Sequence, residues 1–165
     1  MKTIILYGST TGNTKIAAEA IGKQLGIADI RSVEKVFADE LTSYDIIVAG
    51  SSTWGYGEIQ DDWAPLVEKI AKLDLHGKKA ALFGTGDQNS YSDTFVDAIG
   101  ILHDAFSAAG ADIIGDWPAE GYEHTSSRAV RDGRFVGLAL DEDNQAGMTD
   151  ERIKAWVEQL KPELA

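Results

Sequence analysis

The sequence predicts an α/β fold, a doubly wound three-layer sandwich with helices on both faces of a five-stranded parallel sheet. Apolar runs of strand length alternate with segments whose apolar residues recur every three or four positions. This alternation is typical of β-α-β units, in which a strand buried on both faces reads as a continuous apolar run. The expected strand order is 2-1-3-4-5, and an insertion interrupts the fifth strand.

The first half of the chain predicts three strands and one helix. The apolar run 3–7 is the first strand, and a helix follows whose apolar face ends before Gly26, a residue suited to stop it. A weakly marked second strand lies within 29–33. The third strand, 44–50, is a clear apolar run.

The next two helices flank the fourth strand. The first is entered through Asp61 and Asp62, since carboxylates suit a helix N-terminus. The fourth strand is 79–84. The second helix is expected to be capped near Ser92 or Asp93 and to run to Gly110. The apolar residues of the two helices are spaced for a buried face: Trp63, Leu66, Val67 and Ile70, then Phe95, Ile99, Leu102 and Phe106.

The fifth strand is predicted in two pieces, 112–117 and 135–140, separated by the polar insertion 118–134. A last helix begins at Thr149 and stops at Pro162, which cannot continue a helix. The chain contains no internal repeat and no linker-like tract, so we expect one domain over residues 1–165.

The composition narrows the chemistry. The chain has no cysteine, which excludes disulfides, thiolate nucleophiles, iron–sulfur clusters and cysteine zinc sites, so redox work requires a borrowed cofactor. Its net charge of −12 disfavours nucleic acid and anionic membranes and favours basic protein surfaces, although simple solubility explains acidity equally well. No apolar run is long enough to cross a bilayer and no signal pattern opens the chain, so we expect a cytoplasmic monomer.

In this fold, ligands bind beyond the carboxyl ends of the strands, which directs attention to three loops. The loop after the first strand places hydroxyls and backbone amides where a helix begins, which favours a phosphate. It lacks the Walker A spacing and the dinucleotide glycine fingerprint, so a terminal monophosphate fits best. The alternative is an ordinary Ser/Thr helix cap. The candidate residues are Ser9, Thr10, Thr11, Gly12, Asn13 and Thr14.

The other two loops carry aromatic residues with no core periodicity. They can form the walls of a slot, while the alternative is an aromatic lid that packs on the domain's own edge. A monophosphate pocket beside aromatic walls suits a flat ring tethered to a phosphate, as in FMN. The candidate residues are Ser52, Thr53, Trp54, Gly55, Tyr56 and Gly57 in one loop, and Thr85, Gly86, Asp87 and Tyr91 in the other.

Three motifs resemble those of the flavodoxin family: S/T-x-T-G-x-T at 9–14, T-W-x-x-G-E at 53–58 and G-T-G-D-Q-x-x-Y at 84–91. The interrupted fifth strand resembles that of the long-chain group. The resemblance implies a low-potential one-electron carrier, with the FMN phosphate on residues 9–14 and the isoalloxazine ring between Trp54 and Tyr91. It implies ring-edge contacts from Thr85 to Asp87 and a ribityl contact from Asp143.

The resemblance also implies the partners and a role for one glycine. The partners are redox proteins with basic docking surfaces, such as an NAD(P)H-dependent flavodoxin reductase and a terminal acceptor enzyme. Gly55 occupies a position that is glycine or asparagine in the family. Its carbonyl is expected to turn and accept the flavin N5 proton, a backbone rotation that a residue without Cβ permits readily.

Two further readings concern other proteins of this topology. A response-regulator receiver needs clustered carboxylates after the first and third strands. Tyr7-Gly8 and Gly50-Ser51 stand there instead, so that reading fails. An FMN-dependent quinone or NAD(P)H oxidoreductase would carry the same phosphate loop, and it stays open as an alternative, as does a flavin-storage module. The three histidines are scattered along the chain and are expected to be structural or at the surface.

Overall fold

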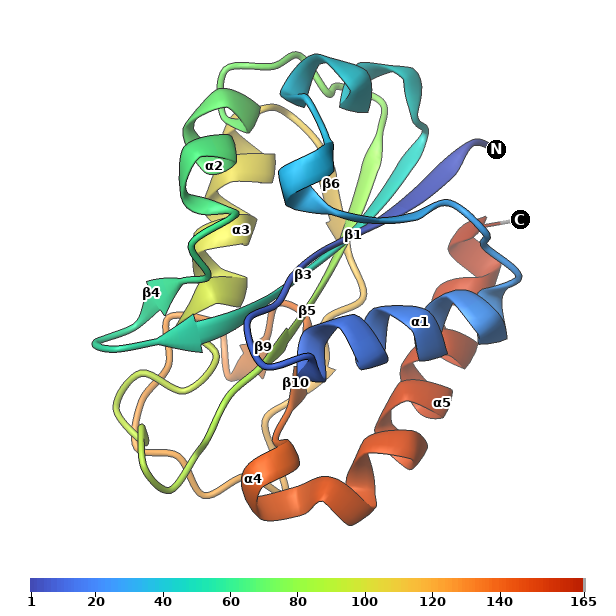
Figure 1. Ribbon diagram of the computed structural model, residues 1–165. Coiled ribbons are helices and arrows are strands. Elements are labelled where there is room, and N and C mark those ends of the chain that lie inside the picture. Colours follow the sequence, from blue (N-terminus) through green and yellow to red (C-terminus); the bar gives the residue numbers. More distant parts are fainter. Residues whose placement is uncertain (165) are drawn as a thin grey trace.

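The computed structural model describes residues 1–164 and has a central parallel sheet with helices on both faces (Figure 1). The strand order along the main path of the sheet is β10-β5-β3-β1-β2, and each neighbouring pair is parallel. The predicted order is therefore confirmed. The strands on this path are β2 (Ile30–Ser32), β1 (Thr3–Gly8), β3 (Ile46–Trp54), β5 (Lys79–Thr85) and β10 (Leu138–Leu140).

The fifth strand position is interrupted, as predicted. β6 (Asp112–Ile114) pairs with the first half of β5, and β10 pairs with its second half. The predicted pieces were too long at their inner ends, because Gly115 adopts a φ of 80° that ends the first one. Beyond it, β7 (Trp117–Pro118), β8 (Val130–Arg131) and β9 (Arg134–Phe135) form a separate antiparallel sheet in the order β7-β9-β8.

The helices form one layer on each face of the sheet. α1 (Asn13–Leu25) and α5 (Thr149–Leu160) cover one face, and α2 (Ala64–Ile70) and α3 (Asp97–Ala108) cover the other (Figure 1). Alternate strand residues point to opposite faces. Ile5 accordingly packs in the core beneath α1 and α5, whereas Ile4 and Leu6 pack in the core beneath α2 and α3. None of the described helices is long and apolar enough to cross a membrane.

Two helix starts differ from the prediction. α3 begins at Asp97 and not near Ser92 or Asp93, because Val96 adopts a left-handed φ of 47° just before it. The backbone N–H of Ala98 is capped from the sheet, by the Thr53 hydroxyl at 3.0 Å. α2 begins at Ala64 and has no side-chain cap, so the acidic pair 61–62 does not cap it.

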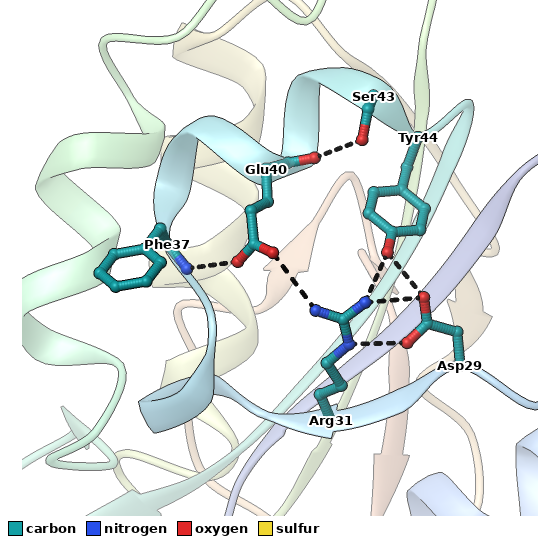
Figure 2. A network of polar contacts seen from close by, with 6 residues as sticks. All are labelled: Asp29, Arg31, Phe37, Glu40, Ser43 and Tyr44. Atoms are coloured by element: carbon teal, nitrogen blue, oxygen red, sulfur yellow. Dashed lines mark hydrogen bonds and ion pairs between the residues drawn. The ribbon is translucent and has the colours of Figure 1, made fainter.

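The edge strand β2 is fastened by a polar network at the end of the sheet where the parallel strands begin (Figure 2). Arg31 Nε lies 2.8 Å from Asp29 Oδ1, and the Tyr44 hydroxyl donates to Asp29 Oδ2 at 2.6 Å. Glu40, in the 3-10 helix Ala38–Ser43, accepts from Arg31 at 3.4 Å. Burial alone would raise the pKa of Asp29, but the hydrogen bonds from Arg31 and Tyr44 lower it below its usual value.

Candidate functional site

A cavity of about 340 Å³ opens at the edge of the sheet where the parallel strands end. All three predicted loops contribute to it, together with the segment after β10. A smaller cavity of about 240 Å³ between α1 and α5 adjoins it and shares Asn13, Thr85 and Glu142. The residues that line the larger cavity are Thr11, Asn13, Ser52, Thr53, Trp54, Thr85, Gly86, Asp87, Tyr91, Glu142 and Asp143.

The first loop leaves the N-terminus of α1 free for an anion. The N-cap residue is Gly12, which has a φ of 98° and makes no side-chain cap bond within the described chain. The first turn of α1 carries no acidic residue. No Ser or Thr side chain therefore caps α1 at its N-cap position in the described residues. Unpaired N–H groups and the helix dipole together favour negative charge at this point.

Several residues of the first loop hold its shape and do not line the larger cavity. The Ser9 hydroxyl accepts from Gly12 N–H at 3.0 Å. Thr14 is buried, and its hydroxyl pairs with that of Thr85 at 2.9 Å, which joins the start of α1 to the end of β5. Gln60 reaches the Thr10 hydroxyl at 3.3 Å. Direct phosphate contacts from these residues stay a prediction.

The second loop is the tip of a hairpin. The predicted strand ended at residue 50, but β3 continues to Trp54 and pairs antiparallel with β4 (Glu58–Ile59). The turn needs its glycines, because Gly55 and Gly57 have φ values of 53° and 92°. Tyr56 at the tip is 96% exposed and does not line the larger cavity.

Two half-exposed aromatic rings from different loops line the cavity. Trp54 is 38% exposed, and its indole N–H donates to the Ser52 hydroxyl at 2.8 Å. Tyr91 is 49% exposed and comes from the loop after β5. Both rings line the cavity instead of packing in either hydrophobic core. Both rings are therefore available to a ligand in the cavity, and their contact with a flavin ring stays a prediction.

The loop after β5 is fastened to the short helix α4 (Glu142–Gln145) by a buried carboxylate. Asp141 is fully buried and accepts from Gln88 Nε2 at 2.7 Å and from Asn144 N–H at 3.0 Å. Asn144 also donates to Asp87 Oδ1 at 2.7 Å. Sequence reasoning missed the roles of Asp141 and Gln88. The signal was present, because Gln88 follows Asp87 and Asp141 lies two residues before Asp143, but a polar residue's burial is not visible in a loop motif.

The acidic residues make one end of the cavity negative. Burial raises the pKa of Asp143, and the neighbouring Asp87, Asp141 and Glu142 raise it further. The pKa of Asp87 moves the other way. Burial would raise it, but the Ser90 N–H and the Asn144 amide bring it below its usual value. An anionic group is therefore favoured at the α1 end of the cavity and disfavoured at the α4 end.

Comparisons with known proteins agree with this geometry. The family model described as Flavodoxin matches residues 5–156. The flavodoxin of Synechococcus elongatus is 45% identical over 162 residues, which cover 96% of this chain and 95% of that protein. Flavodoxin 1 of Escherichia coli K12 is 44% identical over 165 residues, which cover 98% of this chain and 94% of that protein.

A solved structure extends the likeness to three dimensions. Fusobacterium nucleatum flavodoxin, crystallised bound to flavin mononucleotide, superposes with a TM-score of 0.91 at 30% sequence identity. The alignment covers 99% of each chain. The family match spans most of the chain and includes the strands, loops and helix N-terminus that form the cavity. The chain therefore belongs to the flavodoxin family.

Proposed function

We propose that this chain carries electrons, one at a time, on a single FMN held without a covalent bond in the 340 Å³ cavity. Membership of the flavodoxin family makes it an FMN-based electron-transfer protein and not an enzyme with a substrate of its own. One observation carries the assignment of the site: an uncapped helix N-terminus opens beside a cavity walled by Trp54 and Tyr91. The interruption between β6 and β10 supports placing the chain in the long-chain group.

The phosphate end of the site is the loop 9–14. Thr11 and Asn13 line the cavity, and the free N–H groups of the first turn of α1 are suited to hold phosphate oxygens. No lysine or arginine lines this cavity within the described residues, so amides and hydroxyls must supply the binding. A terminal monophosphate fits such a neutral pocket, and the acidic α4 end fits the ribityl chain, with Asp143 as its partner.

The ring end of the site lies between the hairpin and the loop after β5. We assign the two ring faces to Trp54 and Tyr91, and the polar ring edge to the segment Thr85–Asp87. Bound FMN supplies reversible one-electron transfer. The Gly55 carbonyl is our candidate acceptor for the flavin N5 proton, because the hairpin turn places glycine at that position and leaves the peptide free to rotate.

The partners follow from charge. A chain of net charge −12 is attracted to basic protein surfaces over a range that falls with salt. An NAD(P)H-dependent flavodoxin reductase and a terminal acceptor enzyme, each with a basic docking surface, fit this chemistry. We further propose that residues 1–165 act as one domain, as a monomer and in the cytoplasm.

Calorimetry with FMN and riboflavin tests the phosphate assignment. The first loop supplies interactions that riboflavin cannot use, so FMN is expected to bind far more tightly. Thr11→Ala should narrow this preference, whereas Thr42→Ala removes an exposed hydroxyl at the other end of the sheet and should not. Equal affinities of the native chain for the two flavins would refute the phosphate site. NADH or NADPH oxidation by the purified holoprotein alone would favour the oxidoreductase alternative instead.

A further inference from the structure

The insertion lies against the loop that carries Tyr91. Residues 123–128 of the insertion follow residues 88–97 in the same direction, and the two segments form a ladder of hydrogen bonds (Figure 1, orange and yellow-green). None of the residues 118–134 lines the 340 Å³ cavity. The hydrogen bonds to the loop give the insertion an indirect route by which it can act on that cavity.

The middle of the ladder joins insertion donors to loop carbonyls. The backbone N–H groups of Thr125 and Ser126 donate to the Ser92 carbonyl at 2.8 and 3.0 Å. The Ser126 hydroxyl donates to the Asp93 carbonyl at 2.7 Å, and the Ser127 hydroxyl donates to the Phe95 carbonyl. The loop 86–96 contains no helix or strand, so these bonds satisfy carbonyls that regular structure would otherwise pair.

The two ends of the ladder are buried side chains of the loop segment that accept from insertion backbone. Gln88 is 2% exposed, accepts from Glu123 N–H and donates to Asp141. Asp97 is 4% exposed and accepts from Arg128 N–H at 2.8 Å. A Cβ added at Gly57 would overlap Asp97 Oδ2, so this carboxylate packs directly against the hairpin. The ladder thus contacts both the hairpin that carries Trp54 and the loop that carries Tyr91.

We propose that residues 123–128 are a positioning element of the FMN site, which holds the loop 88–97 so that Tyr91 faces the flavin ring. This proposal rests on the proposed function, because it takes Tyr91 to contact the ring. The Ser126 and Ser127 hydroxyls act through the loop backbone and touch no ligand. Fixing the loop in advance removes part of the ordering cost of binding, which slows the dissociation of FMN.

The test is the dissociation rate of FMN from the full chain carrying Ser126→Ala and Ser127→Ala. Loss of two hydroxyl-to-carbonyl bonds should speed dissociation by about three- to tenfold, with weaker quenching of the bound flavin's fluorescence. Ser43→Ala is the matched control, since its hydroxyl donates to the Glu40 carbonyl at 2.8 Å at the opposite end of the sheet. The control should leave the rate unchanged.

A double-mutant cycle separates positioning from general stability. In a Tyr91→Ala background, the serine pair should change the rate by less than about twofold, because the ring that it positions is gone. The same fold-change with and without Tyr91 would overturn the proposal, and so would an unchanged rate in the native background. If the native chain bound no FMN at all, the proposed function would fail instead.

A second pair of variants tests the same proposal if the serine variant does not fold. Asp97→Asn retains an acceptor for the Arg128 N–H, and Asp97→Ala removes it. Faster FMN loss in the alanine variant, with the asparagine variant close to native, supports the ladder. Equal rates in both variants and the native chain contradict it.

Discussion

At the scale of single residues, the site is shaped by polar groups that are already paired within the protein. Asp141 is surrounded by donors from Gln88 and Asn144, and Thr14 pairs with Thr85. Buried polar groups are costly unless they are satisfied, so these pairs fix the loops in one arrangement. Trp54 and Tyr91 are the opposite case, because their half-exposed rings gain most from a ligand that covers them.

The ring of Tyr91 should matter for cofactor binding and not for folding. Stacking contributes about 0.5–1.5 kcal/mol beyond the area that it buries, so Tyr91→Ala should weaken FMN binding about tenfold. Tyr91→Phe keeps the ring and should bind nearly as well as the native chain. Titration of the apoprotein with FMN checks both variants. An early-melting apoprotein with native FMN affinity would show that the ring packs on the protein instead.

Gly55 should set how easily the first electron is added. Gly55 has a φ of 53°, a backbone angle that costs a residue with a Cβ roughly 1–2 kcal/mol. An alanine at this position would therefore restrict the backbone rotation that turns the carbonyl toward the flavin. Gly55→Ala should therefore lower the first one-electron potential by on the order of 50 mV. Spectra recorded during stepwise reduction measure it. Gly147→Ala is the control, because an added Cβ there meets nothing within 4 Å. An unchanged first one-electron potential in Gly55→Ala would mean that rotation of the Gly55 carbonyl plays no part in adding the first electron.

At the scale of elements, the sequence predicted the layers of strands and helices better than it predicted where individual strands and helices begin and end. Apolar runs and helical spacing depend on burial, so the strands and helices followed from them, and the strand order followed from the doubly wound fold class. The hairpin at 53–59 was missed because the polar residues Ser51, Ser52 and Thr53 end the apolar run of β3. The pairing of β3 with β4 depends on backbone hydrogen bonds, which leave no apolar pattern in the sequence. The start of α3 was missed because Val96 adopts a left-handed backbone that its residue type disfavours. The site loops were predictable because their glycines, hydroxyls and aromatics lie outside any periodic pattern.

The network at β2 should make stability depend on pH. The folded pKa of Asp29 lies below its unfolded value of about 3.9, so its contribution is complete above that pH and is lost as pH falls through the folded pKa. Asp29→Asn should cost about 1 kcal/mol at pH 7, since the side chains of Asp29 and Arg31 are each about a third exposed. Urea unfolding at pH 7 and below pH 4 checks this, because the difference from native should shrink on acidification.

Asp39→Asn is the control for the β2 network. Asp39 lies in the neighbouring 3-10 helix and makes no ion pair within residues 1–164. The same charge is removed there without a partner being lost, so the free energy of unfolding should stay near native at both pH values. A gap between native and Asp29→Asn that persists unchanged below pH 4 would mean that the carboxylate charge does not act through Arg31 and Tyr44.

At the scale of the whole molecule, the excess of acidic residues has two separable effects on electron transfer. Added negative charge near the flavin makes the second electron harder to add, because the fully reduced ring is an anion. The same charge attracts a basic partner over a range of about 10 Å at moderate salt. Asp61 and Asp62 are the residues to vary, because they follow the hairpin strand β4 and, as shown above, do not cap α2.

Neutralising this pair should raise the second one-electron potential and weaken attraction to a basic partner. At about 10 Å and an effective dielectric near 40, each charge contributes roughly 0.8 kcal/mol, or roughly 35 mV for one electron. Asp61→Asn with Asp62→Asn should thus raise the potential by roughly 70 mV and flatten the salt dependence of electron transfer to a basic acceptor. Asp39→Asn with Asp112→Asn removes equal charge where the strands begin, and should leave the potential near native while flattening the salt dependence less. Equal shifts of the potential in the two double variants would mean that only the net charge matters. Native potentials and salt dependence in both would mean that the acidic residues serve solubility alone.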